Sequence, residues 1–138
     1  MVNTETEISV NITLSGDCFD LEYVTNTLGI NPTYKRNNTE ILGNGKVFGY
    51  TEWGIGTGYE KSLDIEVQFL KIYSLLKYKE IVLANLAIDC NAEWHIVFVI
   101  KIENGDVPAM VIPKEMIEFC YKIGAEIGFD TYVLSARE

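Results

Sequence analysis

Residues 93–102 read EWHIVFVIKI, and this stretch decides the fold class. Large apolar side chains occupy every second position from Trp94 to Ile102. The positions between them run from Glu93 to Lys101 and hold the polar side chains. A period of two is typical of a strand that has one face in a core and one face toward solvent. The stretch therefore predicts a sheet that is covered on one side only.

Other segments show the same strand character. Residues 6–14 alternate apolar and polar side chains, and residues 126–134 place Phe129 on one side and Asp130 on the other. Residues 47–55 follow the hairpin signal Asn44-Gly45 and form a further predicted strand.

The helix signals lie between these strands. Asp20 is a candidate N-cap for a short helix that ends at Gly29. A longer helix is expected from Ser62, with an apolar stripe of Ile65, Phe69, Ile72 and Leu76. This stripe is widened by Leu63, Val67, Leu70 and Tyr73, so we expect the helix to be heavily buried. Residues 80–86 fit a short helix, although a strand is an alternative there, and a last helix is expected from Pro113 to Ile123.

Together these segments predict an α+β fold, which is a two-layer sandwich with helices on one face of a mostly antiparallel sheet. A ferredoxin-like arrangement is the leading candidate. No linker or internal repeat interrupts the chain, so we expect one domain over residues 1–138. The expected core anchors are Trp53, Phe69, Trp94, Phe98, Phe119 and Phe129.

Composition excludes several functions. The chain has 138 residues, of which 48% are hydrophobic, and 20 acidic against 11 basic residues give a net charge of −9. Nucleic-acid binding needs clustered lysine and arginine, so we expect no nucleic-acid partner. No apolar run approaches the roughly 20 residues of a membrane helix, and no signal peptide is visible, so we expect no membrane partner and a cytoplasmic protein.

No motif predicts a catalytic residue, a cofactor or a metal. The three cysteines, Cys18, Cys90 and Cys120, are far apart and lack a C-x-x-C pair. His95 is the only histidine and has no second histidine at ligand spacing. The G-x-G-x-G of residues 54–58 lacks the lysine of a phosphate loop, so strand kinks explain these glycines better.

Three segments resemble a family of bacterial proteins known only as a domain of unknown function, the DUF-4279 type. They are TNTLGINPT at residues 25–33, YTEWGI at residues 50–55 and GAEIGFDTY at residues 124–132. The resemblance covers the N-terminal, middle and C-terminal thirds in the right order. It implies a compact α+β domain, and it brings no active site with it.

Two hypotheses about function follow. The first is a non-catalytic protein-binding domain, in one form an immunity-type protein that neutralises a basic toxin, because the chain is acidic and lacks catalytic motifs. The alternative is a small-molecule-binding domain or small enzyme with a pocket under residues 32–60. The sequence does not decide whether the chain is an enzyme, although the lack of catalytic motifs favours a protein that is not one. We expect either a monomer or a homodimer, since an open sheet edge can pair with a second copy.

The candidate partner-binding residues lie out of phase with the apolar sets of their strands, so they are expected to share the uncovered face of the sheet. They are Asn11, Thr13, Glu93, His95, Val97, Asp130 and Tyr132. Gly54 and Gly56 are expected on the same face, where they would leave room for a partner to approach.

Overall fold

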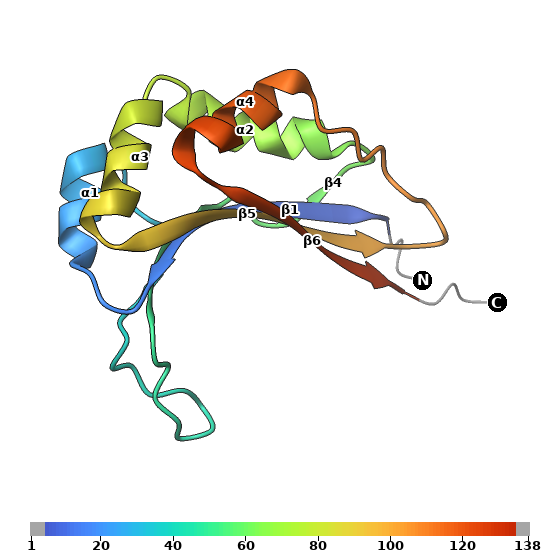
Figure 1. The fold of residues 1–138 in the computed structure, drawn as a ribbon. Coiled ribbons are helices and arrows are strands. Elements are labelled where there is room, and N and C mark those ends of the chain that lie inside the picture. The colour runs from blue at the N-terminus through green and yellow to red at the C-terminus, as the bar shows by residue number, and fades with distance from the viewer. Residues whose placement is uncertain (1–4, 135–138) are drawn as a thin grey trace.

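The computed structural model of the chain describes residues 5–134 as one layer of helices packed on one sheet (Figure 1). In chain order the elements are β1 (Glu7–Gly16), α1 (Leu21–Leu28), β2 (Tyr34–Arg36), β3 (Thr51–Gly56), β4 (Glu60–Lys61), α2 (Ile65–Leu76), α3 (Glu80–Asp89), β5 (Ala92–Ile102), α4 (Lys114–Ile123) and β6 (Glu126–Val133).

The sheet has the order β2-β3-β1-β5-β6, and the short β4 also pairs with β1. All neighbouring strands are antiparallel except β5 and β6, which are parallel and joined through α4. The predicted α+β, two-layer architecture is confirmed. The element order differs from the β-α-β-β-α-β order of the ferredoxin-like arrangement that was the leading candidate, because β2, β3, β4, α2 and α3 all lie between α1 and β5.

All four helices lie on the same face of the sheet (Figure 1). The predicted ends of α1 are confirmed, because Asp20 accepts backbone hydrogen bonds from Glu22 and Tyr23, and Gly29 adopts a left-handed conformation. Gly124 ends α4 in the same way. Residues 80–89 are helical, which decides between the helix and the strand that the sequence left open.

The core lies between the sheet and the helices. Five of the six expected anchors are buried, namely Trp53, Phe69, Trp94, Phe98 and Phe119. The prediction for Phe129 is wrong, since its side chain is 38% exposed and stacks on Phe98 from the edge strand β6. The expectation of a heavily buried second helix is wrong on its outer side, where Val67 and Leu70 are exposed because no layer covers the helices, although Tyr73 packs against the core. Leu63 is also exposed and lies before α2, which begins at Ile65.

Residues 37–50 form an arm rather than the first part of a long strand. The predicted strand over residues 47–55 begins only at Thr51, because residues before it turn away from the sheet. The arm is closed by a bridge between Ile41 and Val47, and it extends from the sheet on the side away from the helices (Figure 1).

Candidate partner-binding face

The side of the sheet opposite the helices is called the open face. Strand register aligns one row of side chains across it, which runs Tyr34, Gly54, Thr13, His95 and Glu126 from β2 to β6. Adjacent residues along a strand point to opposite sides, so every second residue of each strand belongs to this face.

All seven predicted partner-binding residues lie on this open face. Asn11 lies opposite Val97, Thr13 opposite His95, and Glu93 opposite Ser15 on the neighbouring β1. Asp130 and Tyr132 occupy β6 beside Val99 and Lys101. The strands therefore bring these residues together as a surface, while their role as partner contacts stays a prediction.

Tyr34 covers part of this surface from within the chain. Its ring occupies the space above Gly54, and its hydroxyl is hydrogen bonded to the hydroxyl of Thr13, which is 8% exposed. Burial of the phenol raises the pKa of Tyr34. A partner would meet Tyr34 here rather than Thr13. Tyr34 could not be predicted as part of this face, because a side chain that reaches across a neighbouring strand leaves no periodic signal in the sequence.

The expected space above the two glycines of β3 is filled by the same chain. Tyr34 occupies the position above Gly54, and the Asn11 side-chain oxygen occupies the position above Gly56. The backbone N–H of Gly56 also donates to the Thr33 hydroxyl at 2.8 Å. The expectation that these glycines leave room for a partner is therefore wrong, since they make room for Tyr34 and Asn11.

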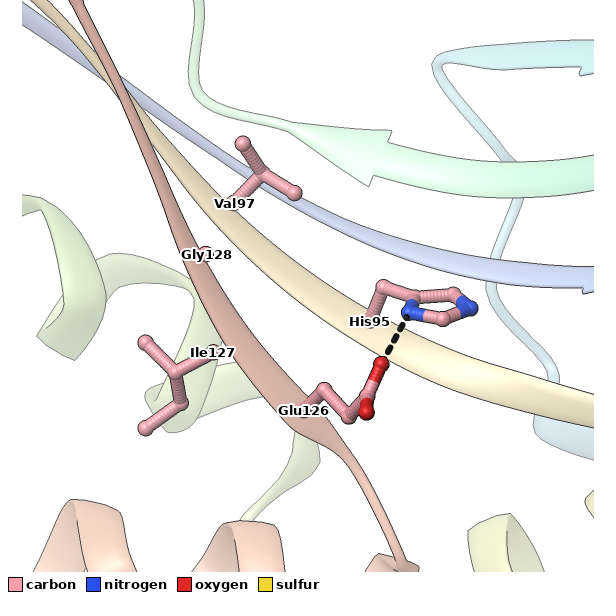
Figure 2. Close-up of a pocket in the computed structure, with 5 residues that line it drawn as sticks. All are labelled: His95, Val97, Glu126, Ile127 and Gly128. Atoms are coloured by element: carbon pink, nitrogen blue, oxygen red, sulfur yellow. Dashed lines mark ion pairs between the residues drawn. The ribbon is translucent and has the colours of Figure 1, made fainter.

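Gly128 on β6 does leave open space. It forms the floor of a hollow of about 480 Å³ that is lined by His95, Val97, Glu126, Ile127 and Gly128 itself and is open to solvent. A β-carbon on Gly128 would meet only a Val97 methyl group, at an ordinary distance of 3.7 Å. In Figure 2, Val97 and His95 stand beside this glycine, while the Ile127 side chain points away from them.

His95 and Glu126 form one wall of this hollow. The distance from His95 Nδ1 to Glu126 Oε1 is 3.6 Å, so the two attract each other when the imidazole is protonated (Figure 2). The Glu126 side chain is 83% exposed and the His95 side chain 32% exposed. Both groups are therefore within reach of a molecule that enters the hollow.

Within residues 5–134, three carboxylates on this side of the open face have no lysine or arginine partner: Glu126, which lines the hollow, and Glu93 and Asp130, which lie beside it. Glu126 is directly opposite His95, Asp130 is opposite Val99, and Glu93 is opposite Ser15. Elsewhere on the open face the register places acids against cations, Glu7 against Lys61 and Glu52 against Arg36. The excess negative charge of the strands on this face thus lies at its β5–β6 side.

Two tyrosines flank the far end of the same face. The Lys101 ammonium lies over the Tyr59 ring, 3.9 Å from its centroid, in a cation–π contact. Tyr132 is the register neighbour of Lys101 on β6 and is 53% exposed. The face thus combines an acidic hollow with an exposed tyrosine, a residue type that is enriched at protein–protein interfaces.

The row Thr13, His95 and Glu126 has the order of a nucleophile, a base and an acid. A catalytic row of this kind requires the hydroxyl to be hydrogen bonded to the imidazole and open to substrate. The Thr13 hydroxyl instead pairs with Tyr34, and none of the hydrogen bonds among residues 5–134 joins it to His95. The row therefore lacks the hydrogen bond between hydroxyl and imidazole that such a catalytic row requires.

The described part of the chain also holds no cluster of three or more histidine, cysteine or carboxylate side chains that is arranged to bind a metal ion. None of the helices within residues 5–134 has the length and apolar character needed to cross a membrane.

Comparison with known proteins places the chain in a family. Residues 6–134 match the sequence model of DUF4279, a domain of unknown function. The chain belongs to the DUF4279 family. The match covers nearly every described residue, including all seven candidate positions on the open face, and it confirms the resemblance seen in the sequence. No curated protein and no solved structure matches the chain.

Proposed function

We propose that this DUF4279 protein is a non-catalytic protein-binding domain that docks a basic partner on the open face of its sheet. The observation that carries the proposal is the hollow over Gly128, because Glu126 lines it and none of its lining residues is a lysine or arginine. Glu93 and Asp130 lie next along the same face of β5 and β6, two residues from His95 and from Gly128. A lysine or arginine side chain of a partner complements such a hollow in shape and in charge.

The partner we favour is a basic toxin domain, which would make the protein an immunity-type inhibitor. The net charge of −9 accelerates encounters with a basic protein, and a rigid sheet presents its contacts without a cost in loop ordering. Pocket binding under residues 32–60 has less support, because none of three hollows, near Gly128, Ile81 and Leu63, is lined by those residues.

We place this function in a reducing compartment and infer a cytoplasmic protein. Cys18, Cys90 and Cys120 are all free thiols, and Cys18 is exposed. Exposed free cysteines persist where thiols are kept reduced, and a reducing cytoplasm is such a compartment.

The test is affinity capture from the native host with the purified protein as bait, followed by a titration with the recovered partner. We expect a basic protein whose binding weakens as salt increases. Asp130→Lys and Tyr132→Ala are expected to weaken binding about tenfold or more with little change in melting temperature, because both side chains are exposed.

Glu118→Lys is the matched control. It makes the same change of charge as Asp130→Lys, but it lies on an exposed position of α4, in the helix layer. The proposal requires that Glu118→Lys bind normally. Equal losses in both lysine variants would show general charge attraction, and normal binding by Asp130→Lys and Tyr132→Ala would refute the open face as the site.

A further inference from the structure

The edge strand β6 is the feature of the molecule that carries a further inference. It is eight residues long, and among residues 5–134 it pairs with β5 alone, so its outer edge presents unpaired backbone groups. Natural sheets protect such edges with short strands, lysine, proline or bulges. The opposite edge does so, since β2 has three residues and carries Lys35 and Arg36. β6 contains no lysine, arginine or proline, and its two charged side chains, Glu126 and Asp130, both lie on the open face, so that its helix side carries no charge.

Apolar side chains accompany this unprotected edge. On the helix side of β6, Ile127 packs against the core, whereas Phe129 is 38% exposed and Val133 further along is 75% exposed. A second strand that pairs with β6 would cover both the backbone groups and these side chains. We propose that the strand is β6 of a second copy, paired antiparallel about a two-fold axis at Phe129, so that the two sheets become continuous.

The charges of β6 select this register. When a two-fold axis at right angles to the sheet relates the two copies of β6, each residue pairs with a residue of the same face on the other copy. The two registers that pair the most residues of β6 place this axis at Phe129 or at Asp130. The Asp130 centre places that carboxylate against its own copy, which is destabilising. The Phe129 centre pairs the two Phe129 rings, places Asp130 opposite Gly128, and places Glu126 opposite Tyr132, so no acids face each other directly.

This dimer leaves the open face uncovered, so it does not depend on the proposed function. Its response to salt also has the opposite sign. Two copies that each carry −9 repel one another, so screening by salt strengthens the dimer, whereas screening weakens the docking of a basic partner.

Sedimentation equilibrium of the full chain in low and high salt tests the proposal. We expect a species of twice the 15.6 kDa chain mass whose share increases with salt. Thr131→Lys places a charge opposite Ile127 of the second copy and is expected to raise the dissociation constant about tenfold or more. Thr39→Lys makes the same change at an exposed position of the arm and is expected to leave the dimer intact. A monomer at all concentrations and salts would overturn the proposal.

Cross-linking identifies the register. In a Cys18→Ser background, which removes the exposed native thiol, single variants Phe129→Cys, Asp130→Cys and Thr131→Cys are oxidised under mild conditions. Directly opposed residues in antiparallel strands have α-carbons about 4.5–5.5 Å apart, which allows a disulfide. Phe129→Cys alone is expected to form covalent dimers rapidly. Faster cross-linking of either other variant would refute the proposed register.

Discussion

The ring of Tyr34 lies directly over the α-carbon of Gly54. The Tyr34 side chain thus reaches from the edge strand β2 across β3, and its hydroxyl is hydrogen bonded to the hydroxyl of Thr13 on β1. Gly54 has no left-handed backbone that would require glycine. The requirement is one of space, because any β-carbon at this position would occupy the place of the ring. Tyr34 and Gly54 thus form a coupled pair on the open face.

This pairing predicts a non-additive double-mutant cycle. Gly54→Ala is expected to lower the free energy of unfolding by about 1–3 kcal/mol, because the new methyl group displaces the Tyr34 ring. In a Tyr34→Ala background the same Gly54→Ala substitution is expected to cost far less. Urea denaturation of the four proteins measures the coupling.

Gly128→Ala is the control for this cycle. Gly128 lies on the same face, but the added β-carbon meets only Val97 at 3.7 Å, so we expect a change in unfolding free energy below about 0.5 kcal/mol. If Gly54→Ala were as well tolerated as Gly128→Ala, the position of the Tyr34 ring would be wrong.

Phe98 and Phe129 stack on each other, but because Phe129 is exposed, we expect their truncation to lower the free energy of unfolding by different amounts. Phe98→Ala removes a fully buried side chain and is expected to cost about 3–5 kcal/mol. Phe129→Ala removes a ring that is 38% exposed and is expected to cost about 1–2 kcal/mol. Thermal and urea unfolding of dilute protein measure both values. A larger loss for Phe129→Ala would place this ring inside the core.

The alternation of apolar and polar side chains predicted much of this fold, because it depends only on each strand having one buried face and one solvent-exposed face. It gave the two faces of β5 correctly from Trp94 to Lys101, and it placed Asp130 with Tyr132 on the open side of β6. Helix ends were predictable for the same reason, since Asp20 and Gly29 act on backbone groups within a few residues of themselves.

Features that depend on tertiary position were not predictable in this way. Phe129 is in phase with the apolar set of β6, yet it is exposed because β6 lies at the edge of the sheet, and strand order leaves no local signal. The hollow over Gly128 likewise needs β6 beside β5 to bring Glu126 next to His95. Single-sequence periodicity predicts which way a side chain points but not which neighbour it meets.

The three thiols are expected to differ sharply in reactivity. Burial raises the pKa of Cys120 from 9.0 to about 11, and burial together with nearby carboxylates raises the pKa of Cys90. The thiolate is the reactive form, so both react slowly in the folded protein. A thiol-reactive dye at pH 8 is expected to label Cys18 alone, and all three cysteines after denaturation. Labelling should fall to zero in folded Cys18→Ala.

The raised pKa of Cys120 also predicts a dependence of stability on alkaline pH. A group whose pKa is raised on folding contributes stability that is present below its unfolded pKa and is lost as pH rises through the folded value. For Cys120 this window runs from about pH 9 to about pH 11. Cys120→Ala is therefore expected to flatten the decline of unfolding free energy across that window, as measured by urea denaturation at several alkaline pH values.

Glu60 predicts the opposite dependence at acid pH. Hydrogen bonds from Lys71 and from Gln68 lower the pKa of this carboxyl, and the Glu60 side chain joins β4 to α2. A lowered pKa contributes stability above the usual glutamate value of about 4.3, and this contribution is lost as pH falls through the lower folded value. Glu60→Gln is expected to be less stable than wild type at pH 7, by no more than about 1 kcal/mol because the pair is partly exposed.

The difference between Glu60→Gln and the wild type should therefore close as the pH falls below about 4. Glu22→Gln provides the comparison, since the ion pair of Glu22 with Lys35 is longer, at 3.4 Å, and its two side chains are 69% and 51% exposed. Water screens that pair more strongly, so a smaller difference at pH 7 is expected for Glu22→Gln. Urea titrations at several pH values provide the measurement. A constant gap between Glu60→Gln and wild type across the acid range would mean that Glu60 stabilises the fold through packing rather than through its charge.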